Sequence, residues 1–381
     1  MAMVWTRIIL PASILAGTII GAGMFSLPFV FQEAGFLTGL IYLAAFAAIY
    51  ILVYWLYADL ILRTYGEHRL VGYARIYFGN AGFWPALFVG LIQLFFVLTI
   101  YLILAPSFSG LIFSGESLNQ LLIFWIIGSL IILFNTRRIA LLEFLMVAGI
   151  VLIIILIAVL GLKKFLLTAN FQESIDWSRI FVAGPILFAL SGSLAVPEVV
   201  SYFKESSAPF SFLKKSLALS SVLPALAYAA FVFGIWGLSG QISEDSVSGL
   251  IGRVPDPVLV FLGILGFLSL ISSYIVVGLN ARRILEYDLF LPGWLSRALV
   301  IFTPPALYFS GFQNFIYLVS FVGLLFLPLE NLLIIFMWLK ADKISDFPPI
   351  IAGNLVRKTV PVLILIFMGV LGYVIINIWQ K

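Results

Sequence analysis

The chain has 381 residues, of which 63% are apolar and only 10% charged, and it contains one His (His68) and no Cys. Soluble domains are nearer one quarter charged, so this composition excludes a water-soluble globule. The absence of Cys and the single His exclude disulfides, clustered thiolate or imidazole metal sites, and Cys or His catalysis. A net charge of +4 is too small to indicate a nucleic-acid partner in so apolar a chain.

Uncharged stretches long enough to cross a bilayer fill most of the sequence. A hydrocarbon core about 30 Å thick requires roughly 20 apolar residues per helix. The stretches without charge cover residues 8–32, 34–58, 76–115, 117–136, 144–162, 180–197, 216–243, 257–281, 298–329 and 359–380. We expect Thr303-Pro304-Pro305 and Gly311-Phe312-Gln313-Asn314 to divide the stretch 298–329 into a short ninth helix and a tenth helix over 315–339. The predicted fold class is an all-α membrane protein with eleven transmembrane helices.

The basic residues are unevenly divided between the predicted loops. With the N-terminus inside, the cytoplasmic loops carry 16 of the 21 basic residues and the opposite side carries 5. Basic residues gather on the cytoplasmic side of membrane proteins. We therefore predict a multi-pass protein of the cell membrane with a cytoplasmic N-terminus and an extracytoplasmic C-terminus. Residues 69–80 mix Arg, Tyr and apolar residues at helical spacing, which predicts a helix along the inner surface.

Two predicted spans contain helix-breaking residues at matching places. The first span contains Gly21–Pro28 (GAGMFSLP) and the sixth contains Ser191–Glu198 (SGSLAVPE). Gly192 precedes Pro197 by the same five residues that separate Gly23 from Pro28. Because Gly and Pro both weaken a helix, we expect both spans to unwind near the middle of the membrane.

One alternative is that Gly17 and Gly21 form a small-residue packing face and that Pro28 and Pro197 only kink their helices. Interruptions in corresponding spans favour instead a transporter site built from inverted repeats. The predicted organisation is one transmembrane domain over 1–381, with a first five-helix repeat over 7–162, a second over 178–340 and an eleventh span over 359–379.

The chemistry of a broken span indicates the kind of ligand. Each helix end leaves about four backbone groups without intrahelical partners, and each orphan costs several kcal/mol in hydrocarbon. The half-helix starting near Gly23 offers N–H groups to a carboxylate, and the carbonyls near Ile20 and Leu190 suit an ammonium. An amino acid carries both groups on one carbon. The predicted substrate-binding residues are Ile20, Gly21, Ala22, Gly23, Phe188, Leu190, Ser191 and Gly192.

These motifs resemble the amino acid–polyamine–organocation (APC) superfamily. Gly21–Pro28, Pro197-Glu198 and the Ser272-Ser273-Tyr274 stretch of the eighth span are most similar to the amino acid/auxin permease branch and its bacterial aromatic and hydroxy amino acid permeases. The resemblance implies a leucine-transporter-like fold, in which spans 1, 2, 6 and 7 rock against spans 3, 4, 8 and 9. It also implies that Phe188 gates the substrate. Phe25, Gln93 and Tyr274 are further expected lining residues, each with ordinary helix packing as its alternative.

One position departs from the bacterial aromatic permeases. They commonly carry a His two residues after the Gly of the sixth span, where this chain has Leu194. The resemblance therefore does not extend to the amino acid side chain that is accepted.

Two acidic residues inside predicted spans are candidates for carrying a proton. An ionised side chain at mid-bilayer costs about 3 kcal/mol, which protonation largely relieves. Glu198, next to the expected site, is the first candidate, and pairing at a helix end near Lys204 is its alternative. Glu330 is the second candidate, and a structural hydrogen bond is its alternative.

The eighth span suggests sodium as the other coupling ion. Ser269, Ser272 and Ser273 share one helix face, although buried Ser often bonds back to its own helix. In relatives, a sodium ion lies between hydroxyls at these places and first-span carbonyls, which are here those of Gly17 and Ile20.

Channels and intramembrane enzymes are the competing classes. A channel requires a polar stripe or a ring of like charges, and an enzyme requires a constellation of acid, base or nucleophile; the sequence has neither. We predict a secondary transporter that imports amino acids by alternating access, with H⁺ or Na⁺ as coupling ion, no other cofactor and no evident protein partner.

Overall fold

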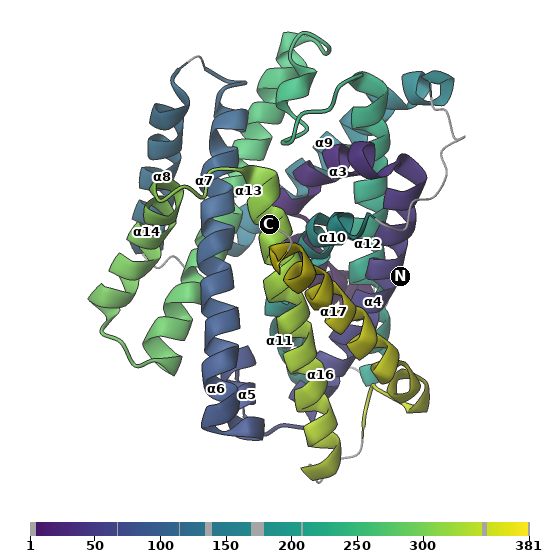
Figure 1. Cartoon of the computed structure of the whole chain (residues 1–381), viewed down its shortest axis with the longest axis vertical. Coiled ribbons are helices and arrows are strands. Elements are labelled where there is room, and N and C mark those ends of the chain that lie inside the picture. Colours follow the sequence, from purple (N-terminus) through teal and green to yellow (C-terminus); the bar gives the residue numbers. More distant parts are fainter. Residues whose placement is uncertain are drawn as a thin grey trace.

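The structure is a computed structural model that describes residues 5–66, 68–113, 115–133, 139–168, 179–206, 209–344 and 349–379. Within these ranges every regular element is a helix (Figure 1). The all-α prediction is therefore confirmed for the part of the chain that is described.

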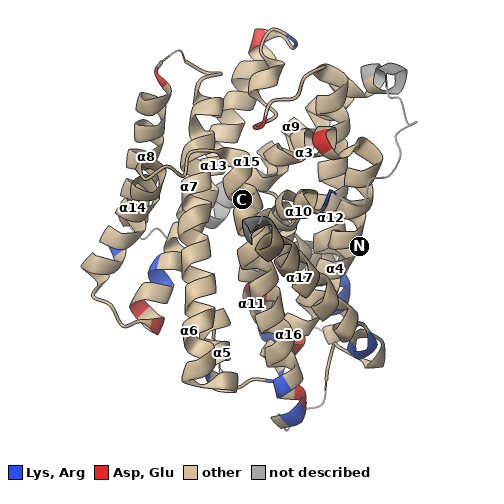
Figure 2. Ribbon diagram, viewed as in Figure 1, with Lys and Arg blue, Asp and Glu red and all other residues tan. Residues whose placement is uncertain are grey.

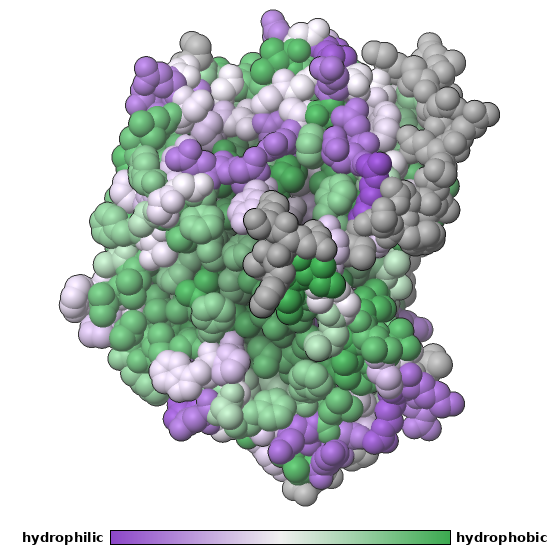
Figure 3. All heavy atoms as spheres, in the orientation of Figure 1, coloured by the Kyte–Doolittle hydropathy of each residue, from purple (hydrophilic) through white to green (hydrophobic). Residues whose placement is uncertain are grey.

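Charged residues gather towards the two ends of the helix bundle, and few lie in its middle (Figure 2). Space-filling shows the same division, with an apolar band across the middle (Figure 3). Among the described residues, seven helices are long and apolar enough to cross a membrane, and a bent pair brings the number to eight. Two shorter apolar helices, Ser117–Leu133 and Ala148–Leu162, accompany them. The count of eleven spans and the division into two repeats stay predictions.

The helices follow one another with short connections. The first half of the chain contains η1 (Trp5–Ile9), α2 (Leu10–Ile19), η2 (Ala22–Ser26), α3 (Leu27–Ala34), α4 (Phe36–Leu62), α5 (Leu70–Phe78), α6 (Asn80–Leu87), η3 (Phe88–Ile92), α7 (Gln93–Ser109), α8 (Ser117–Leu133) and α9 (Ile139–Thr168). The second half contains η4 (Ile180–Val182), α10 (Ala183–Leu190), η5 (Ser193–Ala195), α11 (Val196–Ser206), α12 (Phe210–Leu238), η6 (Ser248–Leu250), α13 (Asp256–Arg283), η7 (Ile284–Asp288), α14 (Gly293–Phe309), α15 (Phe315–Phe321), η8 (Val322–Phe326), α16 (Leu327–Ile344) and α17 (Asn354–Trp379). The helix expected within 69–80 is α5.

The expected division at Thr303-Pro304-Pro305 is wrong, because α14 continues through both prolines. Pro305 has no N–H for the carbonyl of Ile301, one turn earlier. The indole N–H of Trp125 on α8 donates to that carbonyl at 2.9 Å, so the acceptor that Pro305 leaves free is satisfied. The predicted turn at Gly311–Asn314 is present, and α15 begins at Phe315 as expected.

Glycines allow α9 and α12 to approach each other closely. A Cβ on Gly161 would lie 2.0 Å from the carbonyl oxygen of Gly234, and one on Gly237 would lie 2.0 Å from that of Gly161. Contacts this close leave no room for any side chain, as is usual where membrane helices pack through small residues.

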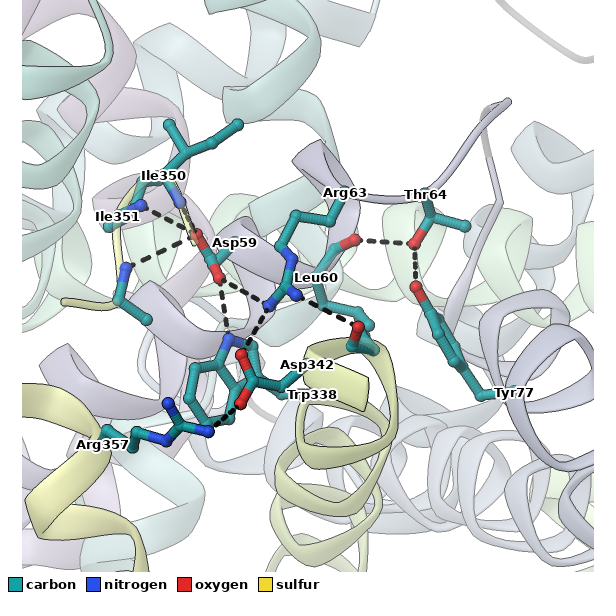
Figure 4. A network of polar contacts seen from close by, with 12 residues as sticks. Asp59, Leu60, Arg63, Thr64, Tyr77, Trp338, Asp342, Ile350, Ile351 and Arg357 are labelled. Carbon is teal, nitrogen blue, oxygen red and sulfur yellow. Dashed lines mark hydrogen bonds and ion pairs between the residues drawn. The ribbon is translucent and has the colours of Figure 1, made fainter. Parts of the chain in front are cut away.

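A buried polar network joins the end of α4 to α16 and to the segment before α17 (Figure 4). Asp59 is fully buried. One of its oxygens accepts from the amides of Ile350 and Ile351 at 2.7 and 2.8 Å, and the other accepts from the Trp338 indole at 2.8 Å. Arg63, one turn later, lies 3.6 Å from both Asp59 and Asp342. This carboxylate therefore fixes three segments that are distant in sequence.

Replacing Asp59 with Asn should destabilise the protein by about 1–3 kcal/mol, because an amide N–H would face the Trp338 indole N–H. The thermal melting temperature in detergent should fall measurably. Asp256→Asn, which changes an exposed carboxylate at the start of α13, is the control. An unchanged melting temperature for Asp59→Asn would show that the network contributes nothing.

Candidate functional site

Both spans with matching motifs are broken at the predicted places. Helix α2 ends at Ile19, and Ile20 and Gly21 are extended before η2 begins. The two parts of this span differ in direction by 53°. Helix α10 ends at Leu190, and Ser191 and Gly192 leave helical geometry before η5. We call these segments the α2/α3 break (Ile20–Gly21) and the α10/α11 break (Ser191–Gly192).

The two breaks pack against each other. A Cβ on Gly23 would lie 2.6 Å from the Cα of Ala189 and 3.0 Å from the ring of Phe188. A Cβ on Gly192 would lie 2.5 Å from the Ile19 side chain. Gly21 is different, because nothing comes closer than 3.9 Å to its Cβ position. This open space gives no support to Gly21 as a packing residue.

Two amides that follow each break make no backbone hydrogen bond among the described residues. They belong to Ala22 and Gly23 in one span and to Ser193 and Leu194 in the other, whereas Met24 and Ala195 donate back to Gly21 and Gly192. The amides of Gly21 and Gly192 themselves lie against the hydroxyls of Tyr228 and Tyr54. The amides of Ala22 and Gly23 are among the N–H groups predicted to face a carboxylate. In an apolar interior, such donors require an acceptor.

Buried tyrosines bind the carbonyls that precede each break. The Tyr228 hydroxyl lies 2.6 Å from the Ile19 oxygen and 2.9 Å from the Ala189 oxygen, and so links the two half-helices. Tyr54 donates to the Leu190 oxygen at 2.8 Å and Tyr50 to the Leu187 oxygen at 2.9 Å.

These tyrosines are not among the residues predicted from the sequence, and the Leu190 carbonyl was predicted to face the ligand. A signal was present, because Tyr50 and Tyr54 are one turn apart in an apolar helix, and a buried hydroxyl requires a partner.

A cavity of about 600 Å³ leads from the end of the molecule that carries Arg69, Lys204 and Arg283 towards the α10/α11 break. We call it the vestibule. Its walls come from α4, α5, α7, α11, α13 and α16. No residue of α2, η2 or α3 lines it, so it reaches only the second of the two breaks.

Glu330 lies at the inner end of the vestibule. It is 5% exposed, and Ser193, directly after the α10/α11 break, donates a short hydrogen bond to it. Gln93 of α7, another predicted lining residue, contacts the same carboxyl group and lines the vestibule. The structure therefore brings Glu330 to the break from 137 residues away.

Glu198 lies nearer the mouth of the vestibule. Its side chain is 52% exposed and pairs with Arg69, with 2.6 Å between Nη2 and Oε1. The expected neighbour Lys204 lines the same cavity. This half-exposed, paired carboxylate therefore lies away from the break.

Part of the predicted sodium site is brought together. The nearest side chain to the Cβ position of Gly21 is the Ser273 hydroxyl, at 3.9 Å. Ser269 and Ser272 are buried, and within the described ranges their hydroxyls make no hydrogen bond. Buried Ser109 and Ser220, by contrast, do bond back to their own helices. The participation of the Gly17 and Ile20 carbonyls stays a prediction.

Aromatic rings close the side of the breaks away from the vestibule. Phe25 is buried, with ring centroids 4.7 Å from Phe108 and 5.7 Å from Phe231. Tyr274, which the sequence analysis placed in the pocket, packs instead against Phe124 and Gly128 of α8.

The loop between α12 and α13 covers this closed side. Ser246 donates to the Phe25 carbonyl at 2.6 Å. Burial raises the pKa of Asp245, but hydrogen bonds from Ser107, Ser243 and Ser248 outweigh burial and hold that pKa below its ordinary value. The ionised Asp245 side chain therefore fixes the loop over the closed side.

Comparison with known proteins gives a family and a fold. A profile of the tryptophan/tyrosine permease family matches residues 5–376. The solved structure of MhsT in complex with L-phenylalanine superposes with a TM-score of 0.64 at 17% identity, covering 95% of this chain and 98% of that one. A manganese transporter of Eremococcus coleocola superposes with a TM-score of 0.57 at 15% identity, covering 97% and 94%. A search of curated proteins finds no match.

Proposed function

The chain belongs to the tryptophan/tyrosine permease family, and from that premise we propose that it imports aromatic amino acids by alternating access. Membership makes it a multi-pass membrane transporter of the APC type rather than an enzyme. The predicted fold, shared with MhsT, agrees with this assignment. The accepted side chain, the coupling ion and the direction of transport are parts of the proposal.

The observation that carries the proposal is the contact between the two breaks. Two amides without a backbone partner follow each break, and Gly23 lies directly against Ala189 and Phe188. Amides of this kind bind a carboxylate at a half-helix N-terminus. The proposed substrate site consists of Ile20–Gly23 together with Phe188, Ser191 and Gly192; Leu190 contributes less, because Tyr54 already binds its carbonyl.

Glu330 is the proposed proton carrier. It is the buried carboxyl group next to the break, whereas Glu198 is half exposed and paired. A buried carboxyl group in a membrane protein is least costly when protonated. Its contact with Ser193 gives a direct way for the α10/α11 break to respond to the proton.

Sodium is the second candidate coupling ion. The unbonded hydroxyls of Ser269 and Ser272 and the nearness of Ser273 to Gly21 favour it. Sodium is a hard cation that prefers oxygen ligands, and hydroxyls and backbone carbonyls supply them.

The proposed state is inward-facing. The vestibule opens at the end rich in Arg and Lys, while the Phe25 cluster and the loop over it close the other side. The positive-inside rule places the basic end in the cytoplasm. The N-terminus would then be cytoplasmic and the C-terminus extracytoplasmic.

Uptake by the purified protein in liposomes tests the function. With a pH gradient and no sodium, radiolabelled L-tryptophan, L-tyrosine or L-phenylalanine should accumulate above equilibrium, and L-alanine and L-glutamate should not. Accumulation driven only by a sodium gradient would establish the second candidate. Failure to exchange any amino acid would contradict the assignment.

A further inference from the structure

The vestibule has unsatisfied polar groups of its own, apart from the contact between the breaks. The oxygen of the Gln93 side chain is buried and has no hydrogen-bond partner, and Gln93 itself is 8% exposed. Its neighbour is the Glu330 carboxyl group. Two oxygen acceptors therefore meet at the inner end of a cavity that is otherwise accessible from the basic end.

Donors lie beside these acceptors. Ser193 and Leu194 both line the vestibule, and their amides are among those without acceptors. Ser193 also contacts Glu330 through its hydroxyl, so the donors and acceptors belong to one small region. Ser193 and Leu194 precede α11, an 11-residue helix whose N-terminus favours a negative group.

This arrangement selects a zwitterion. An ammonium supplies N–H donors to Gln93 and Glu330, while a carboxylate on the same carbon accepts from the amides of Ser193 and Leu194. Tyr57, Leu94 and Ile284 add aromatic and apolar surface to the lining, and charged residues such as Arg69 and Lys204 lie nearer the mouth. A volume of about 600 Å³ lies within the range of roughly 300–1,000 Å³ usual for small-molecule sites.

We propose that the inner end of the vestibule is a second amino acid site, used on release, in which Gln93 and Glu330 bind the ammonium and the Ser193 and Leu194 amides bind the carboxylate. This second site rests on the proposed function. It differs from the site between the breaks, because no residue of α2, η2 or α3 lines the vestibule. When the ammonium occupies Glu330, it takes the place of the proton, which leaves through the vestibule. Proton and substrate then exit to the same side.

A one-sided kinetic effect tests this site. Gln93→Met conserves volume and removes the free oxygen. The L-tryptophan concentration that gives half-maximal uptake should be measured in right-side-out and inside-out membrane vesicles. When L-tryptophan is supplied at the face that bears the vestibule, this concentration should rise about tenfold or more, as expected for a lost hydrogen bond to a charged group. From the other face it should change less than about twofold.

Two further variants keep the test decisive. Gln93→Asn retains the amide but withdraws it by one methylene, and should show the same one-sided loss if Gln93→Met folds poorly. Gln120→Met, which changes an equally buried Gln on α8 away from the vestibule, should affect neither face. If the half-saturating L-tryptophan concentration of both Gln93 variants changes equally at the two faces while the wild type transports normally, the second site is wrong and the proposed function stands. A wild type that transports no aromatic amino acid would overturn both.

Discussion

Glu330→Gln should abolish accumulation driven by a pH gradient while exchange of labelled for unlabelled amino acid continues. One pH unit corresponds to about 1.4 kcal/mol, so symport with one proton gives about tenfold accumulation in the wild type. A Gln side chain still accepts the hydrogen bond from Ser193 but carries no titratable proton. The variant should therefore reach about equal concentrations on both sides. Uptake under an imposed pH gradient and counterflow at equal pH are the two measurements.

Glu198→Gln is the matched variant for this experiment. The sequence alone made Glu198 the first candidate, but its exposed pairing with Arg69 predicts that its loss leaves accumulation above about half of the wild-type value. If Glu198→Gln removes accumulation and Glu330→Gln keeps it, the proposed proton carrier is wrong. If both variants accumulate substrate normally, coupling by either of these two carboxylates is excluded and the sodium candidate is favoured.

Gly23→Ala should separate the two half-helices and cause loss of most transport. The added Cβ would lie 2.6 Å from the Cα of Ala189, and backbone in the last turn of α10 cannot move aside as a flexible side chain could. Overpacking of this kind costs about 1–3 kcal/mol. We expect uptake of L-tryptophan to fall at least about tenfold, together with a lower melting temperature.

Two glycine variants show whether the close approach is responsible. Gly369 of α17 has no heavy atom within 4 Å of its Cβ position, so Gly369→Ala should leave uptake unchanged and should not lower the melting temperature, since Ala is the better helix former. Gly21→Ala lies in the same motif as Gly23 but in open space, and should leave the melting temperature unchanged. Wild-type uptake and stability in Gly23→Ala would contradict the packing of the breaks.

The class of the protein and the two breaks were predictable from the sequence. Hydropathy determines which segments cross a membrane, and Gly and Pro act on the backbone where they stand. The unwound positions at Ile20–Gly21 and Ser191–Gly192 therefore follow from local residues. The rule that Pro ends a helix gave a wrong prediction at Pro304–Pro305. The Ile301 carbonyl, which Pro305 leaves without its helical donor, accepts instead from Trp125 of another helix.

Only the tertiary structure decided how the site is completed. Gly21 and Gly23 are equivalent in the motif, yet only Gly23 touches the opposite half-helix. Glu198 and Glu330 are both acidic residues in predicted spans, and burial next to Ser193 distinguishes them. Tyr228 reaches the Ile19 carbonyl from 209 residues away. These contacts join residues far apart in the chain, whereas composition and spacing constrain only neighbours within a few helical turns.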